Sequence, residues 1–168
     1  MIHFTALPTK VVRAYQSGAP DVYDLIPDRV VSDGRGNPCR HCLRDIPEGA
    51  GFLILAHRPF KGLHPYAETG PIFLCADSCA RHEDNGEAPS VLTTSPEYLI
   101  KGYSAQDRIV YGAGAVVAVQ DLQSSAEAVF ADPAVAYIHV RSSRNNCHLA
   151  RIDRGRDGQR RKQRSGQT

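Results

Sequence analysis

The sequence has no long hydrophobic run. Its longest purely apolar stretches, such as Phe52–Ala56, span five residues, whereas a membrane-spanning helix needs about twenty. The first residues also lack a basic segment followed by an apolar stretch, which is the pattern of a secretory signal. No internal repeat and no Gly-X-Y period is present, so a fibrous architecture is excluded. These absences predict a globular protein without a membrane contact, and we expect it to be cytoplasmic.

Common catalytic motifs are missing as well. There is no Gly-x-Ser-x-Gly elbow, no phosphate-binding glycine loop and no His-Glu-x-x-His helix. Cys147 could act as a nucleophile with His139 or His148 as its base. However, neighbours on a strand such as Cys147 and His148 point to opposite faces. The sequence leaves enzymatic activity undecided and weighs against it.

The net charge of +2 is unevenly distributed along the 168 residues. Residues 154–168 are rich in arginine, hold Asp157 as their one acidic residue, and contain no leucine, isoleucine, valine or aromatic side chain. Such a segment has no apolar surface to bury, so we predict a disordered basic tail. It could contact nucleic acid through phosphates, but a solvated extension explains the composition equally well. We expect residues 1–153 to form one compact domain, with parts at 1–90 and 91–153.

Cysteines give the clearest chemical signal in the sequence. They form two close pairs and one single residue: Cys39-x2-Cys42, Cys75-x3-Cys79 and Cys147. Disulfides are unexpected in a reducing compartment. Two close pairs fit a tetrahedral zinc site, in which each turn supplies two thiolates. Since four protein ligands leave no open position, this zinc would be structural rather than catalytic.

Other readings of these cysteines stay open. They could be reduced, partly buried core residues, or Cys39 and Cys42 could form a redox pair, although no thioredoxin-like alternation of strands and helices surrounds them. Asp77 or Ser78 could cap a short helix that carries Cys79 and His82. His82 would then replace Cys75 as a ligand if Cys75 is not one.

The chain predicts an α+β fold with a small mixed or antiparallel sheet. The N-terminal part, with the cysteine knuckles, predicts short strands at residues 2–7, 10–16, 51–57 and 70–75. The C-terminal part predicts two strands, a helix that ends before Pro133, and two further strands, a ββαββ order, at residues 98–103, 108–119, 121–132, 135–141 and 147–153. The strand at 135–141 is apolar on both faces apart from His139 and Arg141, so we expect it to be central in the sheet.

Polar side chains gather around this central strand and in nearby loops. Alternation along the strand places three of them on one face, while others come from the following turn and from loops of the N-terminal part. The predicted ligand-binding residues are Arg58, Glu68, Tyr137, His139, Arg141, Asn145 and Asn146. They could recognise an anion or a small polar ligand, with Arg141 or Arg58 as a bidentate donor. The alternative is structural, with His139 hydrogen-bonded in the core and Glu68 paired with an arginine.

Several segments resemble a known family. They are residues 38–45, 58–60, 66–73, 107–112, and 140–142 followed by 145–147. In this order they resemble the bacterial family classed as domain of unknown function 1203, over most of residues 1–153. The resemblance implies no activity, because the family has none assigned.

Two positions depart from the pattern that this resemblance implies. A histidine often stands at the position of Cys75, and since histidine is also a metal ligand, the exchange favours a metal over a disulfide. A second cysteine often follows three residues after Cys147, where this chain has Ala150. We therefore expect no redox role for Cys147.

Three classes of function follow. We favour a zinc-stabilised module that binds a small polar or anionic ligand or a protein partner. An enzyme of unknown type that uses a pocket at His139 and Arg141 is the first alternative. Nucleic-acid binding through the basic tail is the second, and it is disfavoured because the rest of the chain has more acidic than basic side chains.

Overall fold

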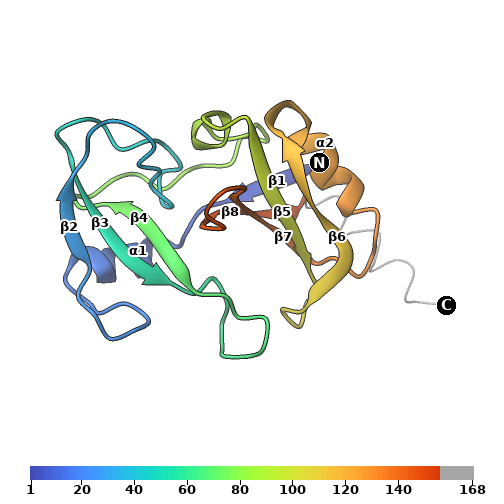
Figure 1. The fold of residues 1–168 in the computed structure, drawn as a ribbon, viewed down its shortest axis with the longest axis horizontal. Coiled ribbons are helices and arrows are strands. Elements are labelled where there is room, and N and C mark those ends of the chain that lie inside the picture. Colours follow the sequence, from blue (N-terminus) through green and yellow to red (C-terminus); the bar gives the residue numbers. More distant parts are fainter. Residues whose placement is uncertain (156–168) are drawn as a thin grey trace.

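The computed structural model describes residues 1–155, which form two antiparallel sheets (Figure 1). The larger sheet has the strand order β1-β8-β7-β5-β6, and the smaller has the order β2-β3-β4. Figure 1 shows the two sheets beside each other rather than stacked face to face. The strand-rich α+β prediction is confirmed.

The elements are arranged in chain order as follows: β1 (Ile2–Thr5), α1 (Thr9–Gln16), β2 (Asp28–Val31), β3 (Gly51–His57), β4 (Gly70–Cys75), the short helix η1 (Ser90–Thr93), β5 (Glu97–Tyr103), β6 (Ile109–Ala118), the short helix η2 (Val119–Asp121), α2 (Leu122–Val129), β7 (Tyr137–Ser142) and β8 (His148–Arg154).

The larger sheet contains the predicted ββαββ unit, built from β5, β6, α2, β7 and β8. Leu122 and Ala126 of α2 and Ile138 of β7 are buried in one hydrophobic cluster with Ile152 of β8. The central position of β7 agrees with its apolar sequence, since both of its faces are covered.

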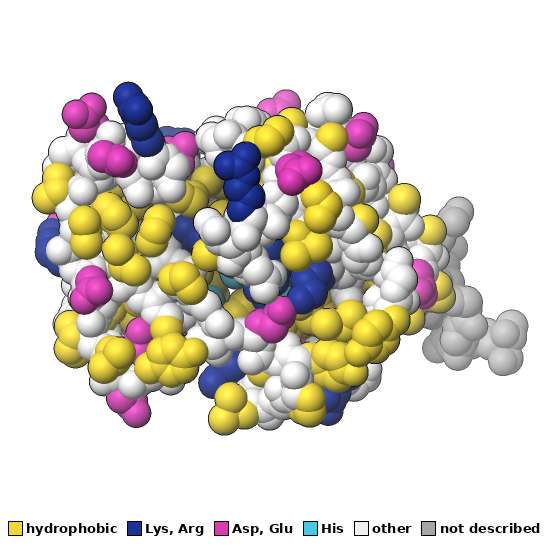
Figure 2. Space-filling view, viewed as in Figure 1, with side chains coloured by type: hydrophobic (Ala, Val, Ile, Leu, Met, Phe, Trp, Pro, Cys, Tyr) yellow, Lys and Arg dark blue, Asp and Glu magenta, His cyan; other side chains and the backbone are white. Residues whose placement is uncertain are grey.

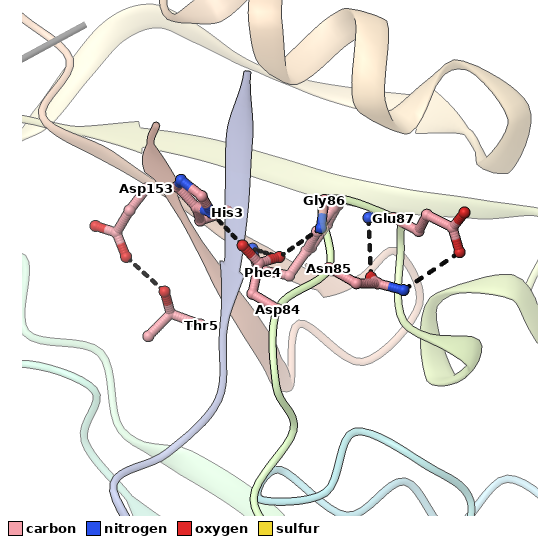
Figure 3. A network of polar contacts seen from close by, with 8 residues as sticks. All are labelled: His3, Phe4, Thr5, Asp84, Asn85, Gly86, Glu87 and Asp153. Carbon is pink, nitrogen blue, oxygen red and sulfur yellow. Dashed lines mark hydrogen bonds and ion pairs between the residues drawn. The ribbon is translucent and has the colours of Figure 1, made fainter. Parts of the chain in front are cut away.

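β1 completes this sheet from the other end of the chain. It pairs with β8, with Phe4 opposite Ile152. The segment after the second cysteine pair is fastened to β1 by Asp84 (Figure 3): its carboxylate contacts the His3 ring and accepts a hydrogen bond from the backbone N–H of Phe4 at 3.1 Å. The N-terminal strand therefore ties both ends of the described chain into one sheet.

The smaller sheet packs against α1, where a strand over residues 10–16 was expected. That prediction is wrong. The two valines favour a strand by intrinsic propensity, but Val12 is buried in the cluster beneath the smaller sheet, and Tyr15, three residues later on the same helical face, packs at its edge. Tertiary packing of this face outweighs the local preference, and Pro8 precedes the helix as its N-cap.

The expected short helix after Asp77 is also absent from the described chain. Between β4 and η1 the backbone is irregular. Here the Cys79 carbonyl accepts a hydrogen bond from Arg13, and the His82 N–H donates to the His41 carbonyl at 2.8 Å. Contacts with distant residues thus replace the helical hydrogen bonds that the sequence suggested.

The predicted basic tail begins at residue 154, but Arg154 is the last residue of β8, and the N–H of Gly155 donates to the Met1 carbonyl at 2.9 Å. Residues 156–168 lie outside the described residues. No helix in residues 1–155 is long and apolar enough to cross a membrane.

Candidate functional site

Four cysteine side chains converge beside the smaller sheet. The sulfur atoms of Cys39, Cys42, Cys75 and Cys79 all lie within 4.8 Å of one another, and the Cys42 and Cys75 sulfurs are 4.0 Å apart. None of these cysteines forms a disulfide. At a zinc–sulfur bond length of about 2.3 Å, the sulfurs of a tetrahedral site are roughly 3.8 Å apart. The cluster therefore has the dimensions of a four-sulfur metal centre.

A tight hairpin supplies the first pair of thiols. Pro38 bridges to Asp45, and within this turn the Cys39 N–H donates to the Arg44 carbonyl at 3.0 Å. Leu43 adopts a positive φ of 51° directly after Cys42, which turns the chain back so that both thiols face the same side. The backbone N–H of Cys75 also points at the Cys39 sulfur, at 3.3 Å.

Helix α1 holds the second pair of thiols in place. Gln16 donates from its side-chain amide to the Cys75 carbonyl at 2.7 Å, and Arg13 donates to the Cys79 carbonyl at 2.8 Å. Cys75 ends β4, whereas Cys79 lies in the irregular chain that follows. Because α1 was not predicted, these supports were not predicted either.

His41 is a second feature that the spacing of the cysteines did not reveal. Its side chain is fully buried, with Nδ1 3.1 Å from the Cys79 sulfur and Nε2 3.0 Å from the Thr9 hydroxyl. A neutral ring that donates from Nδ1 and accepts at Nε2 satisfies both contacts. His82, the suggested substitute ligand, is not part of the four-residue cluster.

The four thiols constrain one another's ionisation. Hydrogen bonds with Cys42 and Cys75 lower the pKa of Cys39 far below its usual value, while the bonds that Cys75 shares with Cys39 and Cys42 raise its pKa. Burial raises the pKa of Cys79 to about 12. Four thiolates this close can be ionised together only beside a cation, which is what a bound metal supplies.

Among the predicted ligand-binding residues, Glu68 and Arg141 form an ion pair. Arg141 Nη2 lies 3.0 Å from Glu68 Oε2, Lys101 donates to Oε1 at 2.7 Å, and the Tyr103 hydroxyl donates to Oε2 at 2.9 Å. Burial acts to raise the pKa of Glu68, but these contacts outweigh it and lower the pKa. This carboxylate therefore holds the loop between β3 and β4 against the larger sheet.

The turn after β7 adds to this network. Arg141 Nη1 donates to the Asn146 carbonyl at 3.0 Å. The Tyr137 hydroxyl, further along β7, donates to Asp107 at 2.7 Å. Asn145 lines a separate cavity of about 490 Å³. Arg141 and Tyr137 thus already have protein partners, whereas Asn145 faces a different cavity.

Arg58 and His139 lie together at a different place. Both line a cavity of about 450 Å³ where the two sheets meet. His57 and His148 line the same cavity, although the sequence did not assign them there. Their convergence depends on strand register, since His148 of β8 stands opposite Arg141 of β7, and register could not be deduced from the sequence.

Cys147 does not form a pair with either nearby histidine. It lines the 490 Å³ cavity, and its thiol contacts the Asn145 carbonyl at 3.7 Å. His139 and His148 line the other cavity. Cys147, the nucleophile considered above, and its two candidate bases therefore line different cavities.

Comparison with known families matches residues 36–154 to the family described as "Protein of unknown function (DUF1203)". The matched region includes all four clustered cysteines and runs from the first thiol hairpin to the end of β8. No curated protein and no solved structure matched the chain. Because the family match spans well over half of the sequence, the chain belongs to the DUF1203 family, as the sequence resemblance suggested.

Proposed function

We propose that the four cysteines bind one zinc ion as a structural centre, and that the protein so stabilised binds a small polar or anionic ligand. The convergence of four sulfur atoms from two separate segments to within 4.8 Å carries this proposal. Soft thiolate ligands in a tetrahedral set suit zinc, which needs neither redox chemistry nor a special geometry.

A metal fits the cluster better than its alternatives do. A dithiol redox centre needs two cysteines, whereas four converge here on one point. Simple core cysteines do not need hydrogen bonds from a histidine ring and a backbone N–H, as Cys79 and Cys39 receive. These contacts are typical of the groups that orient metal ligands.

The proposed zinc has a structural role because the protein supplies all four ligands. No position is left for a substrate or an activated water. The ion would hold the hairpin at Cys39 against the end of β4 and the chain that follows it. Ligand binding then belongs elsewhere, at polar side chains that the fold leaves without protein partners.

Metal analysis of purified protein, combined with thiol titration, tests the zinc centre. We expect close to one zinc per chain. Cys42→Ser should lose most of this zinc and unfold more easily, since structural zinc contributes on the order of 10 kcal/mol in small modules. The loss should be smaller here because the cluster around α2 does not include the centre.

Cys147→Ser is the matched control, because Cys147 lies outside the cluster. It should retain the full zinc content and leave one thiol fewer to titrate. Metal-free protein in which every thiol reacts freely without unfolding would contradict the proposal.

A further inference from the structure

Three histidines from three strands meet in the 450 Å³ cavity between the sheets. His57 ends β3, His139 lies in β7 and His148 begins β8. The ring centroids of His139 and His148 are 4.7 Å apart, and those of His57 and His148 are 6.5 Å apart. Figure 2 shows histidine side chains at the junction of the two sheets. This cluster is separate from the cysteine centre.

The histidine rings are buried without hydrogen-bond partners. They are 8%, 1% and 7% exposed in chain order. Within residues 1–155, both ring nitrogens of His57 and the Nδ1 atoms of His139 and His148 have no partner. A buried polar group left unpaired destabilises the folded protein, so such groups in native proteins call for an explanation. His139 Nε2 and His148 Nε2 are not enclosed in this way, so a ligand in the cavity could accept a hydrogen bond from these two rings.

The charge around the cavity favours an anion. The lining contains four basic side chains, Arg58, Lys61, Arg81 and Arg151. Its one carboxylate, Asp153, already accepts hydrogen bonds from Arg151 Nε and the Thr5 hydroxyl, both at 2.8 Å. Arg58 takes part in no ion pair in the described chain, and its Nε atom has no hydrogen-bond partner there.

A metal ion does not fit this cavity. The ring nitrogens do not form a group close enough for shared coordination, since the cysteine cluster is the one such group found in residues 1–155.

Burial lowers the pKa of His57 to about 4 and holds those of His139 and His148 well below the usual value, and neighbouring arginines add to each effect. The rings are therefore neutral at neutral pH, and each offers one N–H donor.

Part of the lining is apolar. Leu7 and Pro8, which connect β1 to α1, and Val11 of α1 face the same space as Phe60 from the loop after β3. The volume lies within the range of about 300–1,000 Å³ that small-molecule pockets have. An inorganic anion would leave this apolar surface uncovered, whereas an organic anion would cover it.

We propose that this cavity binds a small organic oxyanion, a carboxylate or a phosphate monoester. Its charged group faces Arg58 and the ring N–H groups of His139 and His148, and its apolar body lies against Leu7, Val11 and Phe60. This inference names the ligand class and the place for the ligand-binding half of the proposed function. It does not depend on the zinc.

The test is a titration of the full chain with benzoate, phenyl phosphate and the neutral analogue benzyl alcohol. Calorimetry measures affinity, and NMR of isotope-labelled histidine rings reports the place of binding. We expect at least one anion to bind about tenfold or more tightly than benzyl alcohol, because it gains charge-assisted hydrogen bonds. Comparing benzoate with phenyl phosphate shows which oxyanion the cavity prefers. The ring signals of His57, His139 and His148 should shift.

Arg58→Gln should weaken this binding about tenfold, the loss expected for one charge-assisted contact. Arg35→Gln is the matched control, since Arg35 is exposed and lies in a loop away from the cavity. Thermal unfolding and zinc content of both variants report whether the fold is intact. The wild-type NMR titration needs no variant, so it decides the question even if Arg58→Gln misfolds.

Three results would overturn the inference: no binding of either anion, equal binding of benzyl alcohol, or binding that leaves the three ring signals unmoved. The last would place a ligand elsewhere, so this inference would fail while the proposal of ligand binding survives. Folded protein that contains no zinc yet binds the anion would contradict the zinc proposal alone.

Discussion

Both ring nitrogens of His41 are in hydrogen-bond contact with other side chains, one of which is the thiol of a proposed zinc ligand. Its Nδ1 lies 3.1 Å from Cys79, and Thr9 at the start of α1 fixes the other side of the ring. A donor to a thiolate disperses its charge and orients it toward the metal. His41 is therefore a positioning residue.

Replacing His41 by Phe keeps an aromatic ring but removes the donor. Outer-shell substitutions of this kind lower metal affinity about 10- to 100-fold, and we expect a loss in that range when zinc is measured against a competing chelator. His41→Asn keeps an N–H donor and should recover part of the affinity. If His41→Phe binds zinc as tightly as the wild-type protein, the ring contributes only to core packing and has no role at the metal.

At the residue scale, the cysteine cluster was predictable and its surroundings were not. The two close pairs specified which thiols belong together, because each pair sits on one short segment. The role of His41 depends on Thr9 and therefore on the existence of α1. The histidines of the cavity depend on how β3, β7 and β8 are placed, and no local pattern in the sequence carries that information.

At the scale of elements, Glu68 connects the loop between β3 and β4 to β5 and β7. It accepts from Lys101 and Tyr103 and pairs with Arg141, whose side chain is 4% exposed. Removing the carboxylate leaves the buried guanidinium without its charge partner. Such a loss costs about 3–5 kcal/mol for a fully buried pair, and less here because Glu68 is 30% exposed.

We therefore expect Glu68→Gln to lower the free energy of unfolding by about 1–3 kcal/mol, whereas Glu83→Gln, at an exposed position, should have little effect. Because the folded-state pKa of Glu68 is lowered, its contribution is present above the unfolded-state pKa and is lost as pH falls through the folded-state value. Urea unfolding from neutral to acid pH should show the free energies of unfolding of the wild-type protein and Glu68→Gln converging at low pH. A constant difference at every pH would assign the loss to packing instead.

Elements with strong periodicity or clear turns were predicted well. β3, β4, β5, β7 and α2 lie close to the expected ranges, because alternation, hairpin turns and prolines mark their ends. The strand predicted at residues 10–16 is a helix instead, because α1 is stabilised by burial of Val12 rather than by its own propensity. The helix expected after Asp77 failed because its backbone is bonded to Arg13 and His41.

At the scale of the whole molecule, Arg40 connects the cysteine hairpin to both sheets. Its backbone N–H donates to the Phe73 carbonyl of β4 at 3.1 Å, and its Nε donates to the His148 carbonyl of β8 at 2.8 Å. The side chain is buried and has no carboxylate partner within residues 1–155. A zinc ion with four thiolates carries net negative charge, so the proposed centre next to it would compensate this buried cation.

The absorption spectrum of the cobalt-substituted protein tests the central claim, a closed four-sulfur metal centre, most directly. Cobalt replaces zinc in such sites, and its spectrum reports both the geometry and the presence of thiolate ligands. We predict intense visible bands of tetrahedral cobalt together with thiolate-to-cobalt charge-transfer bands, saturating at close to one equivalent. Cys147→Ser should leave them unchanged, whereas Cys75→Ser should alter both. Weak bands of six-coordinate cobalt, or no uptake of cobalt by the folded protein, would contradict the account.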